Sequence, residues 1–449
     1  MSPVDNRRVA PWISYCRVED EFWILDHRSD VLTKLNPAAS QIFSQLIHGE
    51  SGSAPLLESA CAALRHVLAA EPGGADGEPG GANGEPPAIE DNSDSYFAYR
   101  YLRELALNKC VPLFATLELT FRCNFDCMHC YRPRACQETM TLDRWKTLLV
   151  ELKQMGTLNV VLTGGEPLAW PGLAELVEFL RELRMAFIVK TNGWLLDEAM
   201  ASFLAEHFAS EVHVSLYGAN DDVHDRVTHV PGSFQRAIQA ITRCQEIGLS
   251  TRISCCLTRD NWEEFRGVME VAERHGVGLN FAPVLLPSMA ATIDYRAIRV
   301  TEEQLKQFCE ATVGDGNFRV LRVPGAPVCS AARSNCSIAP DGNVYPCNGF
   351  WYRCSTQSVL ERSFREVWEN SEVLRRVRRL TNSDMADCSA CSHFEFCPRC
   401  PGLGYEESGE LTGKSPGDCL YASCFHDAYR TRPPAAVHGL AGSFGPRCS

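Results

Sequence analysis

The sequence predicts an α/β fold, a partial barrel of six strand-and-helix units between a small N-terminal domain and a cysteine-rich C-terminal domain. Three observations support this prediction. From residue 111 onward, apolar segments with strand and helix periodicity alternate, as in a parallel sheet. Before them, Glu71–Pro87 repeats Gly, Pro and acidic residues and cannot bury a core. After them, cysteines gather between residues 329 and 424 of the 449-residue chain.

The composition favours an acidic cytoplasmic enzyme. A net charge of -13 argues against nucleic acid or an anionic membrane as the main partner, because both require a basic face. Met1–Ala10 lacks the apolar segment of a signal peptide, and no run reaches the roughly 18 apolar residues of a membrane span. The 22 cysteines do not form a secreted disulfide framework, and eleven of them fall into two ordered groups that are expected to be thiolate ligands in a reducing compartment.

The N-terminal domain is predicted to begin with two strands, Pro11–Val18 and Phe22–Asp26. A helix follows at Asn36, whose side chain can cap free N–H groups before an apolar stripe. Further helices are expected at Leu56–Leu68 and Phe97–Asn108, with a disordered insert over residues 70–95.

This order of strands and helices, with the segment DHRSDVLTKLNPAASQIFSQL, resembles the winged-helix-like leader-peptide recognition domain of ribosomally made peptide pathways. The resemblance covers residues 1–110. It implies an open sheet edge to which a peptide can add as a further strand. A winged helix for dimerisation or nucleic-acid binding is the alternative, and the acidic charge disfavours the second.

The barrel is predicted over residues 111–315. Its strands are expected at Leu113–Thr120, Asn159–Thr163, Phe187–Thr191, Glu211–Tyr217, Thr251–Leu257 and Leu279–Val284. Its helices are expected at Leu142–Met155, Leu173–Leu183, Asp197–Phe208, Phe234–Ile247 and Trp262–His275. Because parallel sheets bind ligands at the carboxyl ends of their strands, the segments after these strands are the candidate site.

The first of those segments holds three cysteines, Cys123, Cys127 and Cys130, spaced C-x3-C-x2-C. Three thiolates on one iron–sulfur cube leave one iron free for an outside ligand. A structural zinc knuckle is the alternative that this spacing alone leaves open.

The second strand ends in Gly164, Gly165, Glu166 and Pro167. The glycines let the backbone approach a ligand closely, and the carboxylate suits an ammonium group. Together with CNFDCMHCY upstream, this GGEP segment resembles the radical S-adenosylmethionine superfamily over residues 111 to about 290.

The resemblance implies that Cys123, Cys127 and Cys130 hold a 4Fe-4S cluster whose free iron chelates S-adenosylmethionine. One electron would then cleave this cofactor to a 5'-deoxyadenosyl radical, which abstracts hydrogen from a substrate carbon. A flavodoxin or ferredoxin is the expected reducing partner. The implied cofactor-binding residues are His129, Gly164, Gly165, Glu166, Asn192 and Ser215.

The C-terminal cysteines, over residues 316–430, have the spacings of zinc ribbons, which is one reading. Their order, C-x12-G-x4-C, then CxxC-x5-C and a late cysteine, resembles the SPASM domain, which holds two auxiliary 4Fe-4S clusters. The implied first set is Cys329, Cys336, Cys347 and Cys400, and the second is Cys388, Cys391, Cys397 and Cys419. Two residues separate Cys397 from Cys400 where the family commonly has three, so Cys424 and Cys354 are alternatives to Cys400. The tail, 431–449, is expected to be disordered.

These predictions combine into a radical peptide maturase, an oxidoreductase that installs a thioether, C–C or C–O crosslink in a precursor peptide bound by its leader. The auxiliary clusters are expected to accept the surplus electron or bind substrate. A formylglycine-forming, sulfatase-maturing-like enzyme is one alternative. It is disfavoured because Asn348 stands where those relatives commonly carry a proton-accepting carboxylate. A non-catalytic peptide chaperone or iron–sulfur scaffold is the other.

Overall fold

The computed structural model describes residues 13–19, 21–27, 31–35, 40, 43–44, 93–132, 138–286, 293–313, 322–350 and 357–431. The predicted helix at Leu56–Leu68, most of the predicted insert, nearly all of the predicted tail and Cys354 lie outside these residues.

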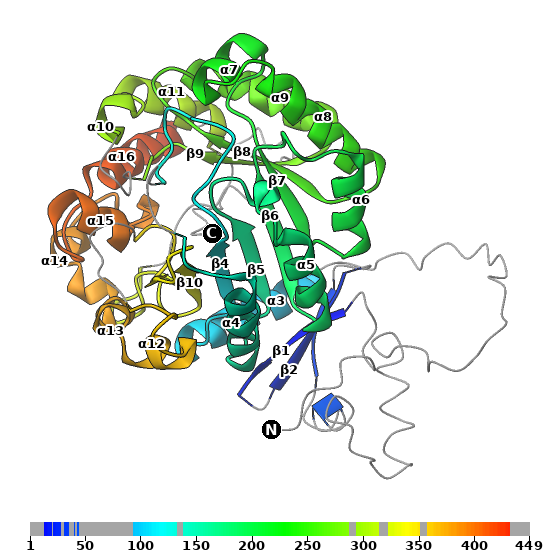
Figure 1. Ribbon diagram of the computed structural model, residues 1–449. Coiled ribbons are helices and arrows are strands. Elements are labelled where there is room, and N and C mark those ends of the chain that lie inside the picture. Colours follow the sequence, from blue (N-terminus) through cyan, green and yellow to red (C-terminus); the bar gives the residue numbers. More distant parts are fainter. Residues whose placement is uncertain are drawn as a thin grey trace.

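Six parallel strands form the centre of the molecule, and they confirm the predicted partial barrel (Figure 1). They are β4 (Phe114–Glu118), β5 (Asn159–Thr163), β6 (Ala186–Thr191), β7 (Glu211–Ser215), β8 (Thr251–Cys256) and β9 (Gly278–Ala282). Each strand pairs with the next in chain order. This order brings the segments that follow the strands to one rim.

Helices cover the outer face of the sheet. They are α4 (Leu142–Gln154), α5 (Leu173–Glu182), α6 (Glu198–Glu206), α7 (Asp221–Thr228), α8 (Ser233–Glu246) and α9 (Phe265–His275), then α10 (Tyr295–Ile298) and α11 (Glu302–Thr312). Thr141 and Asp197 cap the starts of α4 and α6, and α9 ends at Gly276 in the left-handed conformation. The sequence analysis missed α7, which lies between β7 and α8.

The barrel core lies between sheet and helices. Trp145, Leu148 and Leu152 of α4 are fully buried, and so are Val160 and Leu162 of β5. Each such side chain contributes about 1.5–3 kcal/mol by leaving water, which fixes the strands that carry the rim.

The C-terminal domain continues the barrel sheet. Strand β10 (Asn335–Ile338) runs parallel to β4, and β11 (Val344–Tyr345) pairs antiparallel with β10. The helices that follow are α12 (Phe364–Asn370), α13 (Glu372–Arg379), α14 (Ala386–Ser389), α15 (Pro401–Ser408) and α16 (Pro416–Thr431). Helices α12 and α13 are separate, because Ser371 ends α12 and its side chain caps α13.

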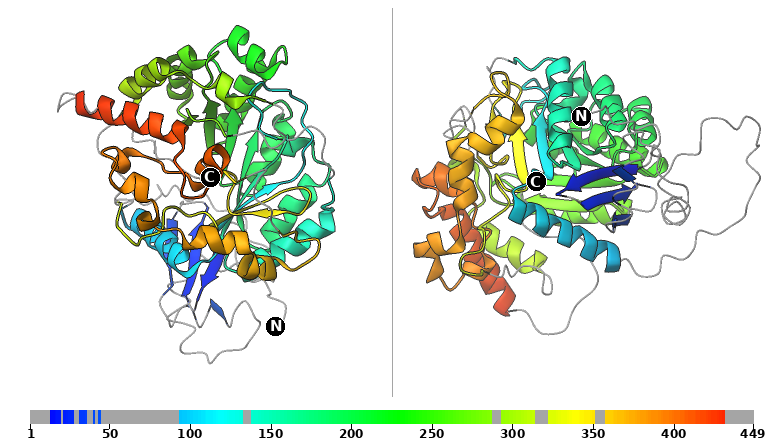
Figure 2. Two further views of the ribbon diagram at one scale, coloured as in Figure 1. Left: turned by 90° about the vertical axis from the view of Figure 1, so that its left-hand side faces the viewer. Right: turned by 90° about the horizontal axis from the view of Figure 1, so that it is seen from below.

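The N-terminal residues form an antiparallel sheet of β1 (Ile13–Val18), β2 (Glu21–Asp26) and β3 (Val31–Lys34), with α3 (Ser93–Lys109) beside β3 (Figure 2). The third strand was not predicted. Because α3 begins at Ser93, the predicted insert ends before that residue. The backbone of β1 meets the barrel, where the Tyr15 N–H donates to the Arg184 carbonyl at 3.1 Å. None of the helices in these described ranges is both long and apolar enough to cross a membrane.

Candidate active site

A cavity of about 530 Å³ opens inside the curve of the sheet. Every barrel strand contributes to its wall, through Thr116, Thr163, Lys190, His213, Ser254 and Asn280 among others. The C-terminal domain supplies Cys347, Asn348, Cys400 and Asp418 to the same wall. The cavity therefore lies between the two groups of cysteines that the sequence singles out.

The three cysteines of the C-x3-C-x2-C segment all line this cavity. Glu138 fixes the start of their loop, since its Oε1 accepts from Thr120 Oγ1 and from the Phe121 N–H, both at 2.7 Å. The loop also donates its Met128 N–H to the Val227 carbonyl of α7 at 3.0 Å. The first strand and α7 thus hold the three thiols in place.

Their environment is suited to a bound cation. Burial raises the pKa of the Cys127 thiol, and the charges of Cys130 and Cys123 raise it further. Burial also raises the pKa of Cys123. Neighbouring, partly buried thiols whose charges repel one another are stabilised as thiolates by a positive metal centre, which fits an iron–sulfur cluster.

The two glycines of the GGEP segment are packed against the cysteine loop. A Cβ atom on Gly165 would lie 2.0 Å from the Arg122 carbonyl oxygen, and one on Gly164 would lie 2.5 Å from that of Thr120. Gly164 also has a φ of +133°, which other residues rarely adopt. Both glycines line the cavity, so only backbone faces a ligand there.

Glu166 lies behind this surface. Its carboxylate is buried and accepts from Thr191 Oγ1 at 2.7 Å and from the N–H groups of Asn192 and Leu168. Burial raises its pKa to about 7, against these hydrogen bonds, which lower it. Glu166 therefore joins the ends of β5 and β6 and is not among the residues that line the cavity.

The other predicted cofactor-binding residues, His129, Asn192 and Ser215, line the cavity. The Asn192 amide donates to Asn124 at 2.8 Å and lies 3.8 Å from the sulfur of Cys123. The His129 ring packs edge-on against Tyr217 at 4.6 Å between centroids. Tyr217 was not singled out in the sequence, although it follows Ser215 by two residues on the same rim.

In the C-terminal domain, Cys347 and Cys400 come together around Gly349, because a Cβ atom there would lie 3.6 Å from either sulfur. Burial raises the pKa of Cys329, and the charge of the nearby Cys400 raises it further. Backbone N–H groups donate to both of the cavity-lining sulfurs, from Gly349 to Cys347 and from Leu403 to Cys400.

Cys336 and Cys424 lie elsewhere. Cys336 on β10 pairs in register with Ala115 of β4, whereas the next residue of β4, Thr116, lines the cavity. Because successive side chains of a strand point to opposite faces, Cys336 lies on the face away from the cavity. The sulfur of Cys336 is 3.9 Å from the Phe114 carbonyl oxygen. Cys424 on α16 is buried beside Cys309, with its sulfur 3.9 Å from the Glu302 carbonyl oxygen.

The second predicted set comes together around the start of α16. Burial raises the pKa of Cys419, and the charges of Cys388 and Cys391 add to this effect. The Cys419 charge in turn raises the pKa of Cys397, after burial and Asp418. The other three thiols of the set therefore all lie within electrostatic reach of Cys419.

Two arginines that sequence reasoning missed stand beside these thiols. Arg399 is buried, with a φ of 46°, and donates to the Gly413 carbonyl at 2.9 Å. Arg322 donates to the carbonyls of Cys397 and Pro398. Their charges lower the pKa of Cys329, against its burial. The only sequence signal was the position of Arg399 next to Cys400.

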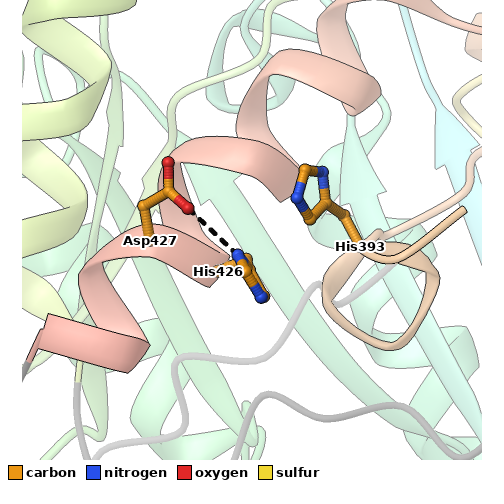
Figure 3. A group of neighbouring side chains, drawn as sticks. All are labelled: His393, His426 and Asp427. Atoms are coloured by element: carbon orange, nitrogen blue, oxygen red, sulfur yellow. Dashed lines mark hydrogen bonds and ion pairs between the residues drawn. The ribbon is translucent and has the colours of Figure 1, made fainter.

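A further group of potential metal ligands, His393, His426 and Asp427, is separate from this cavity (Figure 3). His426 Nδ1 lies 3.0 Å from Asp427 Oδ1, and the His393 and His426 rings are 4.6 Å apart. Asp427 is exposed and already pairs with its neighbour His426, so we do not assign this group to the site.

The fold and the thiol-lined cavity define an enzyme with iron–sulfur cofactors on a partial barrel. Residues 117–272 match the model of the radical SAM superfamily, and residues 329–392 match the SPASM iron–sulfur cluster-binding domain. The chain is 30% identical to the mycofactocin maturase MftC of Mycolicibacterium smegmatis over 358 residues, which cover 75% of this chain and 90% of the relative. The chain therefore belongs to the radical SAM superfamily.

One further relative and one solved structure are also similar over most of this chain. The AdoMet-dependent heme synthase of Methanosarcina barkeri is 25% identical and covers 69% of this chain and 97% of its own length. Streptococcus suis SuiB bound to its precursor peptide SuiA matches with a TM-score of 0.60 at 15% identity, over 92% of this chain and 99% of that one. As a member of this superfamily with a SPASM domain, the chain binds S-adenosylmethionine, a 4Fe-4S cluster and auxiliary iron–sulfur clusters.

Proposed function

We propose that this chain is a cytoplasmic maturase of a ribosomally made peptide, and that it installs a thioether, C–C or C–O crosslink. The observation that carries the proposal is the single cavity whose wall holds both Cys123, Cys127 and Cys130 and, from the other domain, Cys347 and Cys400. A substrate side chain in this cavity would lie between the two thiol groups.

Cys123, Cys127 and Cys130 would hold the cluster that binds S-adenosylmethionine. When bound, the cluster and S-adenosylmethionine would together supply a radical that can abstract hydrogen from a substrate carbon. The backbone at Gly164 and Gly165, with Asn192, His129 and Ser215, would position the cofactor. Glu166 would act indirectly, by holding Thr191 and Asn192 in place.

The C-terminal thiols would hold the auxiliary clusters. Proximity supports Cys329, Cys347 and Cys400 as one ligand set, and Cys388, Cys391, Cys397 and Cys419 as the other. Arg322 and the buried Arg399 would offset the negative charge of such clusters.

The N-terminal sheet supports a peptide as the substrate. Its strand order is β1-β2-β3, and β1 contacts the barrel through the Arg181 guanidinium, which donates to Ser14 Oγ at 3.0 Å. This arrangement leaves β3 as the other edge of the sheet within the described residues. Because the edge strand of a sheet can pair with an added strand, we propose that the leader adds to this sheet at its β3 edge as a fourth strand.

The names of two relatives point to the same substrate class, since one is a mycofactocin maturase and another is the PqqA peptide cyclase of Rhodopseudomonas palustris. The heme synthase among the relatives shows that the barrel and SPASM domains alone do not imply a peptide. The formylglycine alternative would require a proton-accepting carboxylate at Asn348, which lines the cavity as an amide.

The test is anaerobic coexpression with each short open reading frame found beside the gene, followed by mass spectrometry of its peptide. Each crosslink removes about 2 Da, because joining two X–H groups takes away two hydrogens. The purified enzyme with a flavodoxin or ferredoxin should release 5'-deoxyadenosine. An unchanged peptide mass in the presence of 5'-deoxyadenosine would contradict this peptide as the substrate. If no peptide led to release of 5'-deoxyadenosine, the proposal that this chain is a radical enzyme would be contradicted.

A further inference from the structure

The wall of the cavity carries a histidine, His213, with one ring nitrogen that has no hydrogen-bond partner within the described residues. His213 of β7 lines the cavity and is 7% exposed. Its Nε2 lies 2.6 Å from Glu211 Oε2, whereas Nδ1 has no hydrogen-bond partner within the described residues. A buried polar atom without a partner costs about 1–3 kcal/mol, so its position against a cavity calls for a ligand.

Glu211 determines which nitrogen of His213 carries the proton. Burial raises the pKa of Glu211, but the hydrogen bonds and charges of His213 and Arg252 outweigh it and hold the pKa at about 2. Arg252 Nε donates to Glu211 Oε1 at 3.0 Å. An ionised carboxylate can only accept, so Nε2 of His213 bears the hydrogen and Nδ1 is left with its lone pair.

The ring itself stays neutral near pH 7. Burial lowers the pKa of His213, and the positive charges of Lys190 and Arg252 act in the same direction, against the raising effect of Glu211. These three groups face the ring from its own strand and from the two neighbouring strands. Nδ1 is consequently a hydrogen-bond acceptor aimed at a substrate.

Lys190 supplies the complementary donor. It is the register partner of His213 on β6, so the two side chains leave the sheet on the same face, and both line the cavity. Adjacent strands are about 4.8 Å apart, which lets an ammonium and an imidazole converge on one ligand atom.

We propose that Lys190 and His213 form a subsite for a hydroxyl group of the substrate, in which the hydroxyl donates to His213 Nδ1 and accepts from the Lys190 ammonium. The proposal rests on the proposed function, because the hydroxyl is that of a Ser, Thr or Tyr side chain in the modified peptide. A hydroxyl group can donate one hydrogen bond and accept another at the same oxygen. A carboxylate would leave Nδ1 facing another lone pair, and an ammonium group would be repelled by Lys190.

The test compares binding of small probes to the full-length holoenzyme with S-adenosylmethionine present. The N-acetyl amides of tyrosine and phenylalanine form one pair that differs by a hydroxyl, and those of threonine and valine approximate a second. We expect at least one hydroxyl probe to bind about tenfold more tightly than its partner, and the pair that discriminates identifies the side chain. Equal binding within both pairs, or tighter binding of the glutamine amide, would overturn the proposal.

Two variants remove the subsite from either side. His213→Phe removes the acceptor and Lys190→Met the donor, and each should abolish the difference within the discriminating pair. His207→Gln on the end of α6 is the matched control and should preserve it, since His207 bonds only the Phe203 carbonyl within its own helix. Iron content and melting temperature identify a variant that fails to fold, in which case the other variant decides.

A difference that persists in a folded His213→Phe variant would contradict the proposal. The binding comparison needs no cleavage of S-adenosylmethionine. Absence of 5'-deoxyadenosine would therefore refute the proposed function without affecting this result, and equal probe binding would refute the subsite alone.

Discussion

The two groups of thiols that contribute to the cavity wall are built in different ways. Cys123, Cys127 and Cys130 come from one loop of eight residues, held by β4 and by Glu138. Cys329, Cys347 and Cys400 come from segments up to 71 positions apart and meet because β10 joins the barrel sheet and Cys400 caps the start of α15. The first group is therefore a local device and the second a product of tertiary structure.

Their electrostatic surroundings differ as well. The second group has two arginines beside it, Arg322 and the buried Arg399, whose charges lower the Cys329 pKa. Around the first, burial and mutual repulsion of the thiols dominate, and Arg132 opposes them only in part. Loss of the metal should therefore destabilise ionised thiols more in the barrel loop than in the C-terminal domain.

Replacement of a barrel thiol should have the largest effect. Cys127→Ala leaves two thiols in the loop, so we expect complete loss of 5'-deoxyadenosine formation and of about four irons per chain. Iron analysis and chromatography of the reaction measure both. Cys244→Ala, at a buried cysteine of α8, is the control and should keep its iron while losing about 1–2 kcal/mol of stability. Normal cleavage in Cys127→Ala would refute the proposed role of the loop.

Loss of a thiol from the C-terminal group should have a smaller effect, but one that can still be measured. Cys400→Ala removes a sulfur that faces the cavity beside Cys347, and we expect loss of auxiliary iron and of peptide modification. Cleavage of S-adenosylmethionine should persist in part, because the barrel loop is intact. Cys424→Ala is the matched control, since Cys424 lies beside Cys309. If Cys424→Ala and not Cys400→Ala lost iron, the ligand set would have to be reassigned.

A buried acid under the barrel loop provides a pH-dependent contrast. Burial raises the pKa of Glu118 from 4.5 to about 7, against the hydrogen bond from Tyr131, which lowers it. Its contribution to stability is full below pH 4.5 and is lost as the pH rises through 7, up to about 3 kcal/mol. Thermal unfolding at pH 5 and pH 8 should show a smaller loss in Glu118→Gln than in the wild type. An equal loss in both proteins would mean that Glu118 is ionised throughout.

Sequence reasoning reached the parts of the molecule that are locally encoded. The strand-and-helix alternation gave all six barrel strands to within two residues at either end, because period and capping residues are local signals. It missed β3, α7 and the pairing of β10 with β4. Whether Glu166 faces the cofactor or the protein depended on Thr191 and Asn192, which no motif links to it. The isolated Nδ1 of His213 was equally invisible, since it depends on Glu211 and Arg252 from two strands.

The family resemblance and the packing in the structure disagree most clearly at Cys336, although substitution of this residue should have the smallest effect. The family resemblance implies that it is a ligand of the first auxiliary cluster. In the structure its pKa is raised by burial alone, without a charge effect from any other cysteine, and its side chain leaves β10 on the face opposite the cavity. We therefore expect Cys336→Ala to retain its full iron content and peptide modification, and to lose about 1–2 kcal/mol of stability from a small cavity. If Cys336→Ala instead lost as much auxiliary iron as Cys400→Ala, cluster binding would have to reorient β10 or its neighbours. In that case the spacing of cysteines in the sequence would have predicted the ligand set better than the packing.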